Sequence, residues 1–106
     1  MRSVGQARVT GTGQDPRVTE LSAAVARLRR ELAAYPADFL DRGIAEEELA
    51  ALAAMARGGM PEVRRLRRSL LLVAGAIGSV SALGAALTGV REAVELFGDP
   101  SGLSDG

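Results

Sequence analysis

A chain of 106 residues has room for one small domain, and its 13 basic residues, all arginines, balance 13 acidic residues. The chain has no cysteine and no histidine, which excludes disulfides, thiolate chemistry, zinc sites of the usual ligand types and imidazole acid–base catalysis. Basic and acidic residues alternate in blocks along the chain, which argues against a uniformly basic surface for nucleic acid.

The apolar residues are mainly Ala, Leu and Val, and aromatic residues are scarce. This composition favours an all-α fold of tightly packed helices over a β-sandwich. A core of so many alanines buries little area per residue, so a monomer of this size would be marginally stable. We therefore expect a partner, either a second copy of the chain or membrane lipid.

Residues 1–14 contain three glycines and no sustained period, and we expect a flexible N-terminal arm. Asp15 and Pro16 then predict a helix over 16–35, because Asp caps free amides and Pro suits the first helical position. The helix carries a hydrophobic seam at heptad spacing: Val18, Leu21, Val25, Leu28, Leu32. Two interpretations stay open, an amphipathic helix of a bundle or a short dimerisation coiled coil.

A second helix is predicted over 44–57, between the connector that follows Pro36 and the pair Gly58–Gly59. Three consecutive glutamates, 46–48, stand in its first turn, where carboxylates complement the helix dipole. Consecutive residues point in different directions around a helix, so we expect a solvated turn and no metal site there.

The third predicted helix runs over 61–97, from Pro61 to the stop at Gly98–Pro100. At 1.5 Å per residue it would be roughly 55 Å long, which exceeds the width of a small globular domain. The predicted organisation is thus a single helical domain over 15–98, two shorter helices followed by one long Gly/Ala/Leu-rich helix, with a flexible tail over 99–106.

Residues 69–90 carry no charge, and about 20 apolar residues suffice for a transmembrane helix. Preceding arginines would place the N-terminal side in the cytoplasm and could contact anionic lipid; they are Arg64, Arg65, Arg67, Arg68. Within the run, small residues at four-residue spacing predict close helix–helix packing of the glycine-zipper kind; they are Gly75, Gly78, Ser79, Ala82, Ala85, Gly89.

The same helix also suits the interior of a soluble bundle. Its hydrophobic seam continues through the charged flank: Leu66, Leu70, Val73, Ile77, Val80. A lipid-facing span has no reason to extend such a seam beyond its ends, and interfacial Trp and Tyr are missing. Both alternatives stay open, with a slight preference for the membrane, so we expect either an inner-membrane protein with a cytoplasmic N-terminus or a cytoplasmic protein.

No catalytic, cofactor-binding or metal-binding constellation is recognisable. The serines and threonine of the long helix have no candidate base nearby in sequence, and we expect their hydroxyls to bond their own backbone. The arginine cluster over 64–68 has no aromatic residue beside it for nucleic-acid stacking. It can contact anionic lipid, or pair as a solvated face with the acidic second helix.

An Arg/Ala-rich helical hairpin followed by "LRRSLLLVAGAIGSVSAL" resembles a family of small helical proteins of high-GC bacteria. The resemblance covers roughly residues 16–98 and implies no activity, cofactor or site.

We expect a non-enzymatic helical protein that self-associates through its long C-terminal helix, as a single-span inner-membrane protein with a cytoplasmic hairpin. The alternative is a soluble homo-oligomeric bundle acting as an adaptor or interaction module. The Gly/Ala repeat suggests a third, weaker hypothesis, a glycine-zipper pore or toxin-like effector.

Overall fold

The computed structural model describes residues 15–104, with side chains as far as Gly98. This part of the chain forms four α-helices, a short 3₁₀ helix and no strand, which confirms the all-α class. The elements are α1 (Pro16–Ala34), α2 (Arg42–Arg57), α3 (Val63–Ile77), η2 (Ser81–Leu83) and α4 (Gly84–Ser104). The predicted arm over 1–14 and the last two residues lie outside the described residues.

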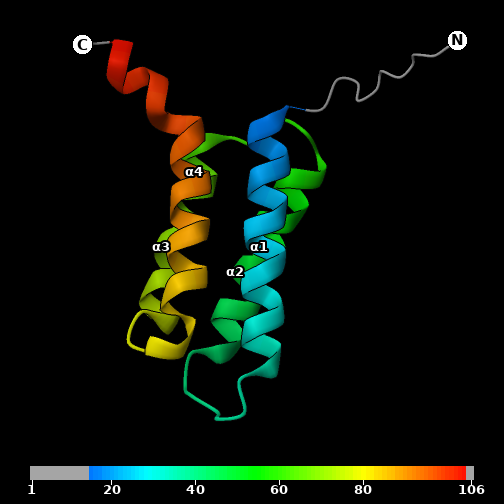
Figure 1. Ribbon diagram of the computed structural model, residues 1–106, viewed down its shortest axis with the longest axis vertical. Helices are drawn as coiled ribbons and strands as arrows, with labels where there is room; N and C mark the ends of the chain where they lie inside the picture. The colour runs from blue at the N-terminus through cyan, green and yellow to red at the C-terminus, as the bar shows by residue number, and fades with distance from the viewer. Residues whose placement is uncertain (1–14, 105–106) are drawn as a thin grey trace, which may run out of the picture.

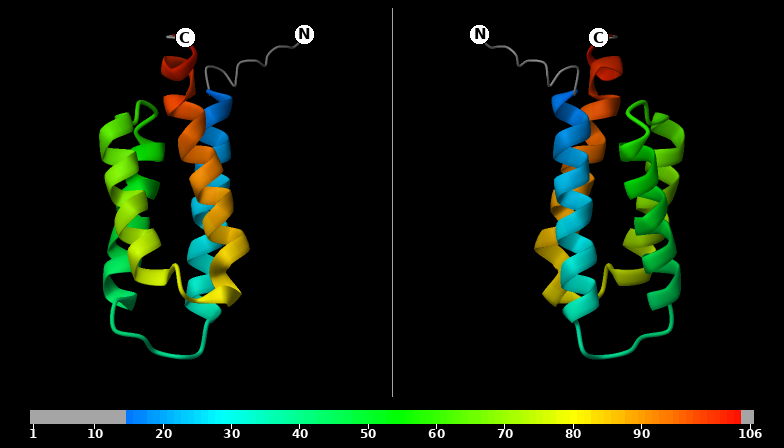
Figure 2. Two further views of the ribbon diagram at one scale, coloured as in Figure 1. Left: turned by 90° about the vertical axis from the view of Figure 1, so that its left-hand side faces the viewer. Right: turned by 90° about the vertical axis from the view of Figure 1, so that its right-hand side faces the viewer.

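The helices form an antiparallel four-helix bundle in which each helix reverses the direction of the one before it (Figure 1). Helices α1 and α4 lie side by side in one layer, and α2 and α3 lie behind them in the other (Figure 2). Short connections between antiparallel neighbours are typical of such bundles. The hydrophobic core lies between the two layers and receives side chains from all four helices.

Helix α1 starts as its sequence predicts. The Asp15 side chain accepts a hydrogen bond from the Arg17 amide at 2.9 Å, and Pro16 occupies the first helical position. The heptad residues of α1 are all buried, and they face the core of the chain's own bundle. The seam of α1 is therefore the core face of an amphipathic helix, rather than that of a separate coiled coil.

The turn between α1 and α2 is organised by Arg42. Its guanidinium donates to the carbonyl oxygens of Tyr35 at 3.0 Å and Ala37 at 3.2 Å, and also to that of Leu32. It therefore joins the last turn of α1 to the loop that follows, where the Leu32 oxygen also accepts from the Tyr35 amide at 3.1 Å. The same side chain lies over the ring of Phe39, 5.8 Å from its centroid. Arg42 also begins α2, two residues before the predicted start.

Residues 61–97 do not form the single continuous helix that was predicted. Helix α3 ends at Ile77, the chain turns over Gly78–Val80, and α4 runs back antiparallel to α3. The Gly78 amide donates to the Ala74 carbonyl oxygen at 2.8 Å, and a Cβ on Gly78 would stand only 2.5 Å from that oxygen. The turn buries both Ile77 and Leu83, because it folds two parts of one seam against each other.

The predicted transmembrane segment over 69–90 is divided between α3 and α4 by this turn. Among the described residues, no helix combines the length and the apolar character that crossing a bilayer requires. The prediction of a single span is therefore not supported by the fold.

Helix α4 also continues beyond its predicted end. Its backbone stays helical through Gly98 and Pro100 as far as Ser104. The predicted helix end at residue 97 is therefore wrong, since the first residues of the expected tail belong to α4.

Candidate functional site

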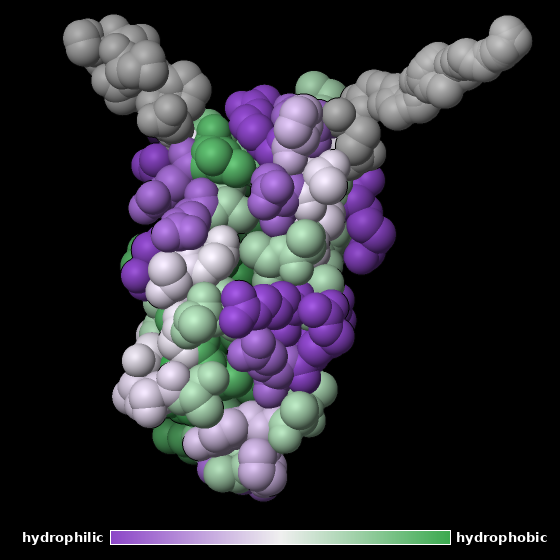
Figure 3. Space-filling model, in the orientation of Figure 1, coloured by the Kyte–Doolittle hydropathy of each residue, from purple (hydrophilic) through white to green (hydrophobic). Residues whose placement is uncertain are grey.

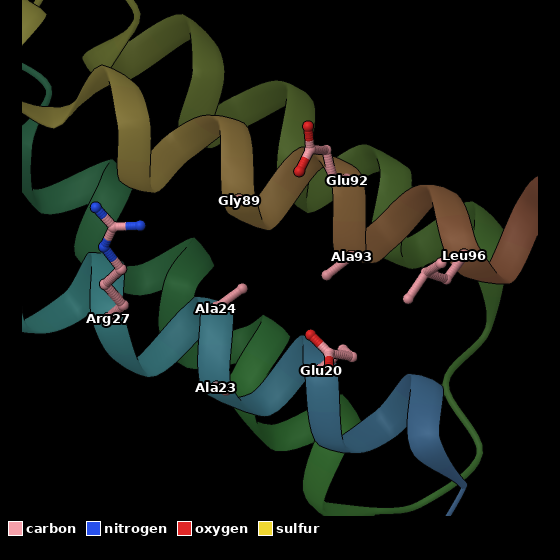
Figure 4. A pocket seen from close by; sticks show the side chains of 8 residues that line it. All are labelled: Glu20, Ala23, Ala24, Arg27, Gly89, Glu92, Ala93 and Leu96. Atoms are coloured by element: carbon pink, nitrogen blue, oxygen red, sulfur yellow. The ribbon is translucent and has the colours of Figure 1, made fainter.

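An open groove lies between α1 and α4, with a volume of about 580 Å³. Figure 4 shows the side chains that line it from both helices. Helix α1 contributes Glu20, Ala23, Ala24 and Arg27, and α4 contributes Gly89, Glu92, Ala93 and Leu96. Because the two helices are antiparallel, Glu20 lies near Leu96 at one end and Arg27 lies near Gly89 at the other (Figure 4).

The groove has a shallow floor of small residues. Ala93 is buried and Ala24 is half-buried, so their methyl groups form a smooth apolar surface between the helices. At Gly89, no heavy atom lies within 4 Å of the place where a Cβ would stand, so the floor is open there. Leu96 projects at the opposite end with 41% of its surface exposed. The groove therefore has a protruding apolar side chain at one end and a gap at the other.

Charged side chains of both signs stand along the rim. Glu20, Arg27 and Glu92 are exposed, and the Arg27 Nε donates to Glu31 on its own helix at 2.9 Å. Figure 3 shows a band of weakly hydrophobic and apolar surface between hydrophilic patches on this face of the molecule. Such an arrangement of apolar centre and charged rim is typical of protein interfaces.

The predicted small-residue packing set is not brought together by the fold. Five of its six members are exposed on the bundle: Gly75, Gly78, Ser79, Ala82, Ala85. The sixth, Gly89, is half-buried and lines the groove. Gly75 lies on α3, whereas Ala85 and Gly89 lie on α4, which follows the turn that begins at Gly78. The set therefore cannot form one continuous zipper face.

The predicted hydrophobic seam lies in the core for most of its length. Leu66, Val73 and Ile77 are buried, whereas Leu70 and Val80 are half-buried and pack at the edge of the core. These residues stabilise the bundle.

The predicted lipid-contact arginines are exposed on α3: Arg64, Arg65, Arg67, Arg68. Arg67 lies against Gly98 of α4. The ion pairs found among the described residues join Arg17 to Asp15, Arg27 to Glu31 and Arg42 to Glu46. The suggested pairing of this cluster with the acids of α2 is therefore absent from the described part of the chain.

One acid of α2 instead contacts a buried hydroxyl. Ser69 is 6% exposed, and its Oγ donates to Glu48 Oε1 at 2.8 Å. The expectation that this serine bonds its own backbone is wrong. The sequence carried a signal, since Ser69 occupies the spacing of buried positions on α3, but nothing in sequence identified Glu48 as the acceptor.

The start of α1 carries the clearest electrostatic feature. The Arg17 guanidinium pairs with Asp15 at 2.8 Å, and its hydrogen bonds hold the pKa of that carboxyl below its ordinary value. Arg17 also lies over the Phe97 ring, 4.9 Å from the centroid, and so connects α1 to α4. Arg17 is exposed and Phe97 is half-buried, and their contact stabilises this end of the bundle.

Within residues 15–98, no group of three or more acidic side chains is arranged to hold a metal ion. The groove offers an apolar floor with charged side chains at its edges.

Comparison with known proteins gives one match. No curated protein and no solved structure matches the chain. A family model, described as a family of unknown function (DUF5955), matches residues 10–98, which include α1, α2, α3 and most of α4. The chain therefore belongs to this family, DUF5955.

Proposed function

We propose that this protein is a non-enzymatic interaction module that self-associates face to face through the groove between α1 and α4. The observation that carries the proposal is the shape of the groove, with Leu96 protruding at one end and the gap over Gly89 at the other. A second copy of the chain presents the same two features, so it can fill the gap that the first copy leaves.

The two features fit each other in one orientation. Leu96 and Gly89 are seven residues apart on α4, which is two turns or roughly 10 Å. When two grooves meet with their α4 helices antiparallel, around a two-fold axis that runs across the groove, Leu96 of each subunit lies over Gly89 of the other. An isologous contact of this kind uses one patch twice and closes as a dimer.

The charges on α1 support the same orientation. Glu20 and Arg27 are also seven residues apart, on the same side of α1. The two-fold axis that joins Leu96 to Gly89 brings Glu20 opposite Arg27 of the partner subunit, so that two ion pairs form. Opposite charges at the rim select the register more than they add affinity.

Small residues permit close approach of the two subunits. Ala24 on α1 and Ala93 on α4 point into the groove, and Ala23 also lines it. None of these side chains is long enough to hold a second subunit away. Methyl-sized side chains allow helices to pack at short interaxial distances. The small side chains therefore let the floors of the two grooves approach each other.

Sedimentation equilibrium of the wild-type chain and of Ala23→Arg tests the proposal. We expect a concentration-dependent dimer of the wild type, and a monomer for Ala23→Arg, because the long charged side chain blocks the groove. Ala54→Arg, at an exposed alanine of α2 away from the groove, is the matched control and retains the dimer. A wild type that stays monomeric at millimolar concentration, or equal loss in both variants, contradicts the proposal.

A further inference from the structure

A second surface lies on the outer face of α3 and does not depend on the proposed dimer. While Leu66 and Val73 of α3 enter the core, Arg64, Arg68 and Leu71 are exposed. Residues at spacings of four and three follow one side of a helix, so these three form a continuous outer stripe. Helix α3 belongs to the layer behind α1 and α4, so the stripe is accessible whether or not two grooves meet (Figure 2).

The arginines stand where helix electrostatics disfavour them. Arg64 and Arg65 occupy the first turn of α3, at the positive end of the helix dipole, where cations destabilise. Arg64 and Arg68 are also four residues apart on one face, a spacing at which like charges repel. The described ion pairs join other arginines, so no acid of the bundle offsets this repulsion by a salt bridge. An anionic surface would offset both costs at once.

Two leucines of α3 expose apolar surface next to the arginine cluster. Leu71 is 72% exposed and Leu72 is 41% exposed, although both belong to the middle of a helix with a well-filled core side. They stand three and four positions after Arg68 in sequence, which is about one turn further along the axis. The outer face thus combines cations with protruding aliphatic side chains.

We propose that the outer face of α3 docks on the surface of an anionic phospholipid bilayer. The arginines contact the lipid phosphates, and Leu71 and Leu72 enter the boundary between head groups and acyl chains. Arginine suits this role because its guanidinium binds phosphate with two parallel hydrogen bonds. The helix lies along the membrane surface, and the bundle remains outside the hydrocarbon.

Other polyanions fit these residues less well. A nucleic acid would gain nothing from two exposed leucines, and no aromatic residue of α3 is present to stack on a base. A protein partner would have to supply cavities for Leu71 and Leu72, whereas a fluid lipid surface accepts protruding side chains of any shape. The pairing of cations with exposed aliphatic groups therefore favours lipid.

Vesicle flotation with the full chain tests the proposal. One set of vesicles contains phosphatidylcholine alone, and the other contains phosphatidylcholine and phosphatidylglycerol in equal parts. We expect the wild type to float with the anionic vesicles, to stay unbound with the neutral ones, and to be released by high salt. Loss of basic residues near an anionic surface weakens binding by about fivefold per residue.

Two matched double variants distinguish the effect of the arginines on α3 from the effect of the net charge of the protein. Arg64→Gln/Arg68→Gln removes two arginines from α3, and we expect binding roughly 25-fold weaker. Arg29→Gln/Arg30→Gln removes two exposed arginines from α1 with the same change in net charge, and we expect nearly wild-type binding. Circular dichroism checks that each variant keeps its helix content. Equal loss in both variants would overturn the proposal, since binding would then follow net charge alone.

A third variant tests the apolar contribution. Leu71→Ser replaces an exposed side chain, so it leaves the core intact, and we expect several-fold weaker flotation with anionic vesicles. If Leu71→Ser floats as well as the wild type, the proposal that this side chain enters the bilayer is overturned. Absence of binding to anionic vesicles overturns the lipid assignment, and retention of a DNA duplex by the same arginines would identify a nucleic-acid surface instead.

Discussion

The hydroxyl of Ser69 on α3 donates a 2.8 Å hydrogen bond to the carboxylate of Glu48 on α2. Ser69 is almost completely buried and Glu48 is half-buried, so the bond lies at the edge of the core between two antiparallel helices. The bond adds a directional contact to the leucine packing between α2 and α3. It joins residues 21 positions apart in sequence.

Removal of this hydroxyl should destabilise the bundle. We expect Ser69→Ala to lower the free energy of unfolding by about 1 kcal/mol, because Glu48 loses a donor in a partly buried place. Urea denaturation measures the change. In a double-mutant cycle with Glu48→Ala, the two effects should be less than additive, and full additivity would show that the two side chains do not interact.

Arg42 should be the most sensitive position of the α1–α2 turn. Its guanidinium satisfies three carbonyl oxygens around the end of α1, and its side chain is only 19% exposed. We expect Arg42→Ala to lower the free energy of unfolding by about 2 kcal/mol, since hydrogen bonds from charged groups are involved. Arg57→Ala, at the exposed end of α2, is the control and should change stability little. Equal effects of both variants in thermal unfolding would contradict the role of Arg42.

The Asp15–Arg17 pair should make a small part of the stability depend on acid pH. Hydrogen bonds from Arg17 lower the pKa of Asp15 below its ordinary value of 3.8 in the folded chain. A depressed folded pKa means that the contribution is present above that ordinary value and is lost as the pH falls through the folded pKa. Asp15→Asn keeps a capping side chain without the charge. We expect the wild type to melt higher than Asp15→Asn at neutral pH and the gap to close below about pH 4; a constant gap would contradict the assignment.

Two glycines of the same region should respond oppositely to alanine. At Gly78 a Cβ would stand 2.5 Å from the Ala74 carbonyl oxygen, whereas at Gly75 it would meet nothing within 4 Å. We expect Gly78→Ala to cost about 1–3 kcal/mol through overpacking at the turn. Gly75→Ala should stabilise by about 0.5–1 kcal/mol, because alanine is the better helix former. Calorimetric melting compares the two, and a change of the same sign in both would refute the turn geometry.

Charge reversal should test whether Glu20 faces Arg27 of the partner subunit, as the proposed arrangement of two grooves requires. Glu20→Arg and Arg27→Glu each place like charges opposite one another in a homodimer, and we expect self-association about tenfold weaker for each. Mixing the two variants restores opposite charges at both contacts, so a heterodimer should form.

The sign of the Glu92→Gln effect then tests the position of the two-fold axis. Glu92 stands midway along the groove, so in the antiparallel arrangement it approaches Glu92 of the partner subunit. Glu92→Gln should therefore strengthen association. Weaker association of this variant would instead place Glu92 against a cation such as Arg27 of the partner subunit and exclude the antiparallel register.

The spacing of apolar residues predicted the buried side of α1, because residues at heptad spacing lie on one face of a helix. It failed at residues 78–80 because a continuous helix and a helical hairpin both retain spacings of three and four. The consecutive three-residue steps from Ile77 to Val80 and Leu83 mark the break, but only the packing of α4 on α3 decides it. The groove could not be predicted either, since it pairs residues of α1 and α4 that are some seventy positions apart.

The turn at Gly78–Val80 has a consequence for chain connectivity. With four helices in alternating directions, the start of α1 and the later part of α4 lie at the same end of the bundle, where Arg17 covers the Phe97 ring. Arg17, near the start of α1, and Phe97, on the later part of α4, are thus adjacent. The α1–α2 and α3–α4 connections lie at the opposite end of the bundle (Figure 1). A bundle built in this way can be inserted as a cassette into a surface loop of a host protein with little separation of the host's flanking residues.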